Sequence, residues 1–279
     1  MTDERGAGRG SLILGGAGRN VTVATVSTVV FFTVLVLVIV NAPGWPKVKS
    51  TFFNADEFRT WFWPVLHAFT LNIKIAIVAE LFILVLALGL AIVRSLQGPV
   101  FFPLRLMAIM YTDVFRGIPT IMLVYLLGFG VPALQLQGSA LRNPTYLAAV
   151  ALVLIYTAYV SEVYRAGILS VHPSQDAAAR SLGLTRWQTT KTVIIPQAVR
   201  RVVPPLLNDF IGLQKDTALI SVLGVVEGLQ RANLASASDF NYTPYVIAGL
   251  FFVLITIPQA RLTDWLIERD RRRQFASAR

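Results

Sequence analysis

The chain has 279 residues, of which 55% are hydrophobic and 14% are charged, and its formal net charge is +10. Soluble proteins carry about 25% charged residues, so this composition argues against a water-soluble fold. The chain has no cysteine, which excludes a disulfide framework, a Cys-ligated metal and a Cys nucleophile. Its two histidines, His67 and His172, are far apart in sequence, so we expect no metal site.

The first predicted element is an uncharged run of twenty residues, Val21–Val40. At about 1.5 Å per residue this run is long enough to cross a hydrocarbon core of about 30 Å. A cleaved signal peptide is the alternative, but its apolar core usually spans only about 7–15 residues and ends at an A-x-A site, which is missing here. We therefore predict a cytoplasmic tail at residues 1–20, an uncleaved extra transmembrane helix at residues 21–40 and an extracytoplasmic loop at residues 41–66.

Five further apolar segments complete an all-α membrane protein of about six transmembrane helices. They are Leu71–Val93, Leu106–Phe129, Tyr146–Val160, Val202–Leu223 and Tyr245–Ala260. If both termini are cytoplasmic, most of the 25 lysines and arginines lie on the cytoplasmic side, in agreement with the positive-inside rule. The basic tail at residues 264–279 then serves as an anchor on anionic lipid. Nucleic-acid binding by this tail is the alternative, but a basic cluster alone is an unspecific signal.

The loop between the fourth and fifth spans, about residues 170–196, predicts a helix, a glycine corner and a second helix. Ser174 is the expected N-cap, Gly183 the expected C-terminal stop, and Thr185–Gln188 forms a second capping box. Pro196 is expected to break the second helix. A DNA-binding helix-turn-helix has similar spacing. Because both ends of this loop are tied to membrane spans, we favour docking to a soluble partner over DNA binding or a purely structural loop.

This loop resembles the cytoplasmic loop of permease subunits of bacterial ABC importers, in particular the polar amino acid branch. The family signature is an EAA triplet, three residues, a glycine, nine residues and then I-x-L-P. Ala177-Ala178-Ala179, Gly183, Val193, Ile195 and Pro196 fall on that spacing. The branch-specific surroundings also match at "AYVSEVYRAGI" (158–168), "PQAVRRVVPPLLNDFIGLQKDTAL" (196–219) and "FRGIP" (115–119). The resemblance covers about Leu66–Leu262 and implies a MetI-like permease domain at residues 67–263.

The chain departs from the family pattern at three positions. The Glu of the triplet is replaced by Ala177, with Asp176 one position earlier, while Ser174 replaces a Gly and Ala218 a Ser. The corner keeps its shape without this carboxylate, but an ion pair to the ATPase from Ala177 is lost. Asp176, turned about 100° around the helix, does not replace it directly. The ATPase-coupling residues that the resemblance implies are Ser174, Gln175, Asp176, Ala177, Ala178, Ala179, Gly183 and Pro196.

The glycines at residues 15–18 are followed by Arg19-Asn20 and form no nucleotide-binding P-loop, so the chain does not supply its own ATP energy. We expect a non-enzymatic subunit that binds no cofactor itself. The resemblance implies two partner ATPases that hold ATP and Mg, a second permease that is identical or related, and an extracytoplasmic solute-binding protein. It also implies a bacterial inner, cytoplasmic membrane. The expected substrate is a polar amino acid, with glutamate or glutamine first and arginine, lysine and histidine open.

Charged residues inside the predicted spans require a reason, because each costs about 2.5–3.5 kcal/mol at the bilayer centre. The residues predicted to line the substrate pathway are Glu80, Arg116, Asn208, Asp209, Lys215 and Asp216. Two alternatives stay open: a structural ion pair of Lys215 with an acid on a neighbouring helix, and an Arg116 that snorkels to the interface. A helix break is expected at residues 117–119. Glu162 and Arg165 are expected to form a pair on the helix surface.

Two rival functions belong to other classes. An ion-coupled secondary carrier would use Glu80, Asp209 or Asp216 as a proton relay, and its transport would continue after ATP depletion. A membrane-anchored scaffold without a pathway would take up no substrate at all.

Overall fold

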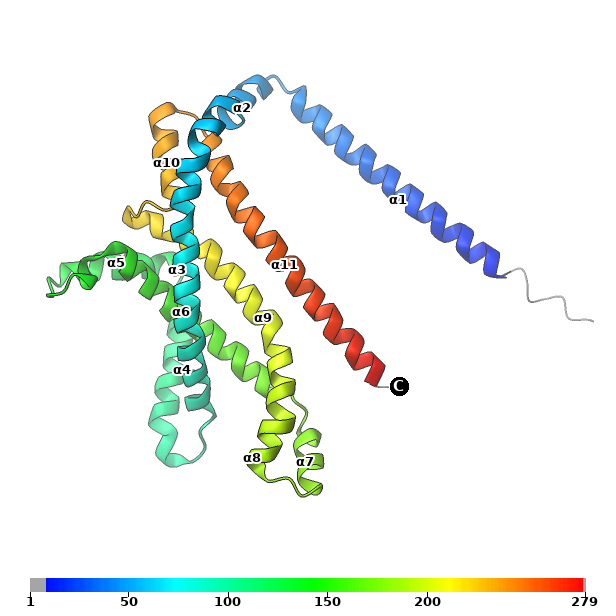
Figure 1. Ribbon diagram of the computed structural model, residues 1–279, viewed down its shortest axis with the longest axis vertical. Helices are drawn as coiled ribbons and strands as arrows, with labels where there is room; N and C mark the ends of the chain where they lie inside the picture. Colours follow the sequence, from blue (N-terminus) through cyan, green and yellow to red (C-terminus); the bar gives the residue numbers. More distant parts are fainter. Residues whose placement is uncertain (1–8, 278–279) are drawn as a thin grey trace, which may run out of the picture. The chain divides into compact units, whose positions relative to one another are not determined.

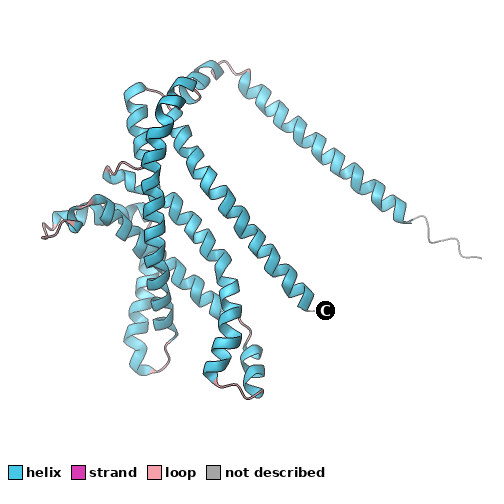
Figure 2. Ribbon diagram, viewed as in Figure 1, coloured by secondary structure: helices cyan, strands magenta, loops and turns pink. Residues whose placement is uncertain are grey.

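The computed structural model describes residues 9–277, and every regular element in that part of the chain is helical (Figure 2). The predicted all-α fold is therefore confirmed. The chain divides into two compact units, with the boundary between Asn54 and Ala55. The outermost residues of the two predicted tails, 1–8 and 278–279, lie outside the described residues.

The first unit contains α1 (Arg9–Val40) and α2 (Trp45–Phe52). The apolar part of α1, Asn20–Val40, buries no side chain within the structure. A helix that exposes apolar residues all round needs an apolar environment, which agrees with the predicted transmembrane helix.

The prediction of a loop at residues 41–66 is corrected by the structure, in which most of this segment is helical. Pro46 lies in the first turn of α2, where its fixed φ favours helix and its missing N–H costs nothing. The next helix, α3 (Ala55–Ser95), starts well before the predicted boundary at residue 67. Asp56 and Glu57 lie in its first turn, where negative charge stabilises the helix dipole.

Six long helices form the second unit: α3, α4 (Phe102–Gly117), α5 (Thr120–Ala133), α6 (Pro144–Leu169), α9 (Ile195–Asp216) and α11 (Thr243–Ser277). Helix α6 lies at the centre of this unit and packs against α3, α4, α5 and α9. Its Ala148, Leu152 and Ile155 side chains are fully buried. A second apolar cluster joins α3 to α10 and α11 through residues such as Phe69 and Phe251.

Short helical elements connect the long ones. They are η1 (Pro99–Phe101), η2 (Ala140–Arg142), α7 (Pro173–Ser181), α8 (Arg186–Thr189), η3 (Thr190–Ile194), η4 (Thr217–Leu223) and α10 (Gly228–Asp239). Within this unit, α7 and α8 lie at the end opposite to α10 (Figure 1). The cytoplasmic loop predicted from the sequence therefore forms one end of the bundle.

Four helical segments of the described chain are long and apolar enough to cross a membrane: Asn20–Val40, Trp45–Ser95, Pro144–Leu169 and Thr243–Arg269. The pair of α4 and α5, which is bent by 102°, passes the same test together and counts as a fifth if it forms one broken span. The break was expected at this place, and Pro119 explains it. Proline disfavours helical backbone at the preceding residue, and Ile118 is extended, with φ −89° and ψ 130°.

The predicted span Val202–Leu223 corresponds to α9 and η4. It is not among the five apolar segments, and α9 carries Asp209, Lys215 and Asp216 besides two arginines. These charges keep α9 outside that set, and its crossing of the bilayer stays a prediction. Helix α9 packs closely on α6 because Gly167 lacks a side chain. A Cβ at Gly167 would collide with Val202.

A buried polar network ties α3 to the start of α10. The Asn72 amide donates to Thr217 Oγ1 at 3.0 Å and to Glu227 Oε2 at 2.8 Å, and its oxygen accepts the Gly228 N–H at 3.0 Å. Glu227 also caps α10 by accepting the backbone N–H groups of Leu229 and Gln230. Burial raises the pKa of the Glu227 carboxyl, and these three hydrogen bonds act in the opposite direction. A buried polar atom without a hydrogen bond destabilises a fold, and the buried side-chain atoms of Asn72 and Glu227 avoid this cost because they are hydrogen-bonded.

We expect Asn72→Ala to destabilise the bundle, because it removes one donor from the buried Glu227 carboxylate and leaves the Gly228 N–H unpaired. The loss of about 2–3 kcal/mol should lower the midpoint of thermal unfolding in detergent by roughly 5–10 °C. Asn233→Ala is the matched control, because Asn233 also makes two side-chain hydrogen bonds but lies exposed. Equal shifts for the two variants would contradict a stabilising role for the buried network.

Candidate functional site

Three carboxylates and a tyrosine meet between α3, α6 and α9. The Tyr156 hydroxyl donates to Asp216 Oδ2 at 3.1 Å. Asp209 lies close enough to interact electrostatically with both Tyr156 and Glu80. Glu80 and Asp209 each have one buried carboxylate oxygen without a hydrogen-bond partner among the described residues. A buried carboxylate without a partner is costly, so this cluster is suited to hold a positively charged group.

The register of α9 decides which of its polar residues face this cluster. Asp209 and Asp216 are seven residues apart and are both partly buried, as their predicted shared face requires. Asn208 and Lys215 are both exposed, so the structure does not bring them into the cluster. Lys215 makes no ion pair within the described part of this chain, and the alternative of a structural pair finds no partner there.

Gly212 makes room for the Tyr156 side chain on α9. A Cβ at Gly212 would lie 3.1 Å from the Tyr156 hydroxyl oxygen, closer than ordinary van der Waals contact. Asp216 follows one helical turn later on the same face, within reach of that hydroxyl. The missing side chain at Gly212 therefore lets Tyr156 reach Asp216.

Arg116 lies at the end of α4, beside the break, and α6 holds it in place. Its guanidinium lies over the Tyr159 ring at 5.7 Å from the centroid and 3.9 Å from Glu162 Oε1. Glu162 also pairs with Arg165 at 2.9 Å and with Arg94. The expected pair of Glu162 and Arg165 is confirmed, but the sequence did not indicate that Arg94 and Arg116 join it.

Arg116 and the carboxylate cluster are connected through two tyrosines along one face of α6. Tyr156 and Tyr159 are one turn apart, and their ring centroids are separated by 6.1 Å. Tyr159 contacts Arg116, whose guanidinium is about half exposed, while Tyr156 contacts Asp216. The site therefore has a positive end at Arg116 and a negative end at the carboxylates, which is complementary to a zwitterion.

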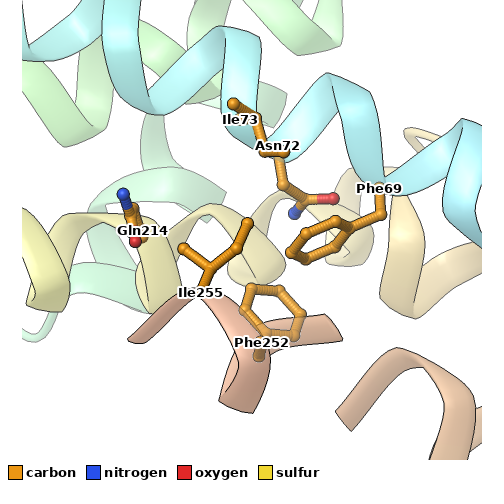
Figure 3. A pocket seen from close by; sticks show the side chains of 6 residues that line it. All are labelled: Phe69, Asn72, Ile73, Gln214, Phe252 and Ile255. Atoms are coloured by element: carbon orange, nitrogen blue, oxygen red, sulfur yellow. The ribbon is translucent and has the colours of Figure 1, made fainter. Parts of the chain in front are cut away.

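A small cavity lies next to this site, between α3, α9 and α11 (Figure 3). Phe69, Asn72, Gln214 and Phe252 are among its walls, and the Gln214 Oε1 atom has no hydrogen-bond partner among the described residues. Its volume is about 10 Å³. A space of that size holds at most one water molecule, so this cavity is not a substrate site.

The corner formed by α7 and α8 begins with a cap that differs from the prediction. His172, not Ser174, is the N-cap of α7, and its Nδ1 accepts the Ser174 N–H at 3.2 Å. Pro173 takes the first helical position, which moves the cap one residue before it. The predicted stop at Gly183 is confirmed. Gly183 has φ +88°, and its N–H donates to the Arg180 carbonyl while Leu184 N–H donates to that of Ala179.

The second half of the corner contains one confirmed motif and one correction. Thr185 and Gln188 form the predicted capping box at the start of α8. The helix does not end at Pro196. It continues through η3, a π-helical turn, into α9, whose first turn contains Pro196. Proline has no backbone N–H and would leave one carbonyl of a regular α-helix unpaired. The π turn before Pro196 has a different hydrogen-bond register, which accommodates the missing N–H.

The exposed face of the corner is apolar at two positions. Leu182 and Trp187, on either side of Gly183, are 84% and 69% exposed. Ala179 is buried and anchors α7, whereas Gln175, Ala177 and Ala178 are exposed. Asp176 pairs with Arg180 on its own helix at 3.9 Å. Leu182 and Trp187 were not among the residues predicted from the sequence, although two large apolar residues near a glycine in a polar loop are a detectable signal.

Known proteins resemble this chain over most of its length. The family model of the binding-protein-dependent transport system inner membrane component matches residues 100–272. The arginine transport system permease protein ArtQ of Bacillus subtilis is 35% identical over 195 residues, which are 69% of this chain and 86% of ArtQ. The putative glutamine transport system permease protein GlnP of Rickettsia conorii is 32% identical over 207 residues, which are 72% of this chain and 92% of GlnP.

Solved structures agree with this assignment. The crystal structure of an amino acid ABC transporter with histidines aligns with a TM-score of 0.68 and 28% identity, over 78% of this chain and 98% of that one. The inward-facing MetNI methionine ABC transporter shares the fold, with a TM-score of 0.59 and 17% identity over 74% of this chain and 96% of that one. On its fold, its apolar helices and the family match, this chain is a multi-pass membrane protein that belongs to the binding-protein-dependent transport system inner membrane components.

Proposed function

We propose that the chain is the permease subunit of an ABC importer and forms the transmembrane pathway for a polar amino acid. One observation carries this proposal: Arg116 and the cluster of Glu80, Asp209 and Asp216 are joined through Tyr159 and Tyr156 along one face of α6. An amino acid carries one negative and at least one positive group, and the site offers a partner of opposite charge for each kind. The names of the relatives, which include arginine and glutamine permeases, support the same class of substrate.

Each end of the proposed site has a defined role. The Arg116 guanidinium donates paired hydrogen bonds to the substrate carboxylate. Asp216, held by the Tyr156 hydroxyl, accepts the α-ammonium group. Lys215 and Asn208 are exposed next to these residues, where they meet the substrate as it enters or leaves.

The balance of charge in the site bears on the choice of amino acid. Glutamate or glutamine was the first choice from the sequence. Glu80 and Asp209 add two carboxyl groups beyond the one that pairs with the α-ammonium group, and Arg116 already shares Glu162 with Arg94 and Arg165. A substrate with a second positive group gains from this surplus, so arginine or lysine fits the site better than glutamate, and glutamine is intermediate.

The energy for transport comes from partner subunits. We propose that two ATPase subunits, which bind ATP and Mg, dock on the corner formed by α7 and α8. Leu182 and Trp187 present an apolar surface to them, and Ser174, Gln175 and Asp176 a polar one. A second permease, identical or related, and a solute-binding protein on the outer side complete the importer, with both termini in the cytoplasm.

An ion-coupled carrier would keep transporting after ATP depletion with the proton gradient preserved, whereas the importer should stop.

Neutralising Asp216 should stop transport without disassembling the complex. We expect Asp216→Asn to reduce amino acid uptake at least tenfold in proteoliposomes, because substrate loses a charged partner worth about 1.5–3 kcal/mol. Lys215 is exposed outside the cluster, so Lys215→Met should reduce uptake less. Basal ATP hydrolysis and complex yield should persist, since the docking corner is unchanged. Asp264→Asn is the control, because Asp264 forms an exposed pair with Arg261 on α11. If a double variant of Lys215 and Asp216 recovers uptake, the two residues form a structural pair and the pathway assignment is wrong.

A charge at the tip of the corner should weaken ATPase docking. Leu182→Asp places a carboxylate on a residue that is 84% exposed, so the permease itself should fold and insert normally. Interface positions of this kind cost about 2 kcal/mol or more when disrupted, so co-purification of the ATPase should fall at least tenfold. Leu134→Asp is the matched control, because Leu134 is 67% exposed in the connection after α5. Undiminished ATPase recovery with Leu182→Asp would show that the partner docks elsewhere.

A further inference from the structure

An apolar groove of about 450 Å³ runs along the surface between α3 and α6. Its volume lies within the range of about 300–1,000 Å³ that is typical of ligand sites. Val78 and Phe82 line the groove and are 53% and 58% exposed. Glu80 lies about 200° around α3 from Val78, so the groove is on the opposite side of this helix from the acidic cluster.

The groove is polar at one end and apolar at the other. Helices α3 and α6 run in the same direction, since Arg94 near the end of α3 pairs with Glu162 near the end of α6. Lys74 and Tyr146 therefore lie at one end of the groove, and Leu86 and Leu154 at the other. The twelve residue steps from Lys74 to Leu86 rise by about 18 Å, a little more than half of a hydrocarbon core of about 30 Å. The groove thus has the length of one leaflet.

Lys74 is placed to meet a negatively charged group at the membrane surface. It is exposed and makes no ion pair within the described part of the chain. Side chains in helices lean towards the N-terminal end, which for Lys74 is the end of α3 nearer to the membrane surface. Tyr146, in the first turn of α6, has the position that aromatic residues favour at this depth.

We propose that this groove is a binding site for one phospholipid, whose acyl chain lies along α3 and α6 and whose phosphate contacts the Lys74 ammonium and the Tyr146 hydroxyl. The occupant follows from the charge and the length of the groove. A helix of a second permease in the same place would bury Lys74 and would have to supply a carboxylate, whereas every phospholipid carries a phosphate at that depth. The bound lipid would pack α3 against α6, the helices that carry Glu80 and Tyr156.

The test counts the lipids that stay bound to the purified permease–ATPase complex. The delipidated complex is titrated with phosphatidylglycerol and observed by native mass spectrometry. Lys74→Gln should weaken the tightest lipid-binding step about fivefold, the effect expected for one lysine near a membrane surface. Val150→Trp, which fills the groove from α6, should remove that step. Lys49→Gln on α2 and Val85→Trp, at a residue of α3 that is 72% exposed outside the groove, are the matched controls.

Two results would overturn the proposal. The first is an unchanged lipid-binding step in both Lys74→Gln and Val150→Trp. The second comes from crosslinking through single introduced cysteines, which is possible because the chain has no cysteine of its own. If Phe82→Cys in native membranes crosslinks efficiently to a second permease while Val85→Cys does not, the groove is a protein interface. A weaker step in Lys74→Gln and a lost step in Val150→Trp, with no crosslink at Phe82, support a lipid site.

Discussion

The need to pair every charge that is removed from water separates the structural polar groups of this bundle from the functional ones. Glu162 has Arg94, Arg116 and Arg165 around it, and Glu227 accepts three hydrogen bonds. These carboxylates are satisfied within the chain. Glu80 and Asp209 are also partly buried, but each keeps an oxygen without a partner among the described residues. Because a carboxylate in an apolar bundle is costly, a chain that leaves two of them unpaired is complementary to a cation that comes from outside.

Helix α6 connects this unpaired charge to the rest of the molecule. Its buried side chains Leu152 and Ile155 form the centre of the core, and three residues at spacings of three, Tyr156, Tyr159 and Glu162, lie along the proposed site. Arg116, in the last turn of α4 before Pro119, contacts Tyr159 and Glu162 of α6. The proline therefore has two effects: it turns the chain by 102°, and it places a cation at the end of a helix beside the proposed path of the substrate.

The sequence predicted the features that depend on neighbouring residues. The apolar runs, the break at Pro119, the capping box at Thr185 and the positive φ of Gly183 each follow from a few adjacent side chains. Features that join distant segments were missed. Asn72 and Glu227 are 155 residues apart, and Arg94 and Glu162 are 68 apart, so no local pattern indicates either contact. Three local predictions were also wrong. The segment 41–66 is mostly helical, His172 caps α7 because Pro173 takes the first position, and the π turn accommodates Pro196.

The error at Pro196 matters for coupling, because a helix end there would have separated the corner from the proposed site. Instead α8, η3 and α9 form one continuous helical path from Thr185 to Asp216. A force that the partner ATPases apply at Leu182 and Trp187 would therefore act on the same rod that carries Asp209 and Asp216. The π turn and the internal pair Pro204 and Pro205 interrupt the regular hydrogen bonds of this path, and π turns are frequent at functional sites. If docking and substrate binding occur where we propose, they need no relay of separate contacts, because α9 connects the proposed docking corner to the proposed site.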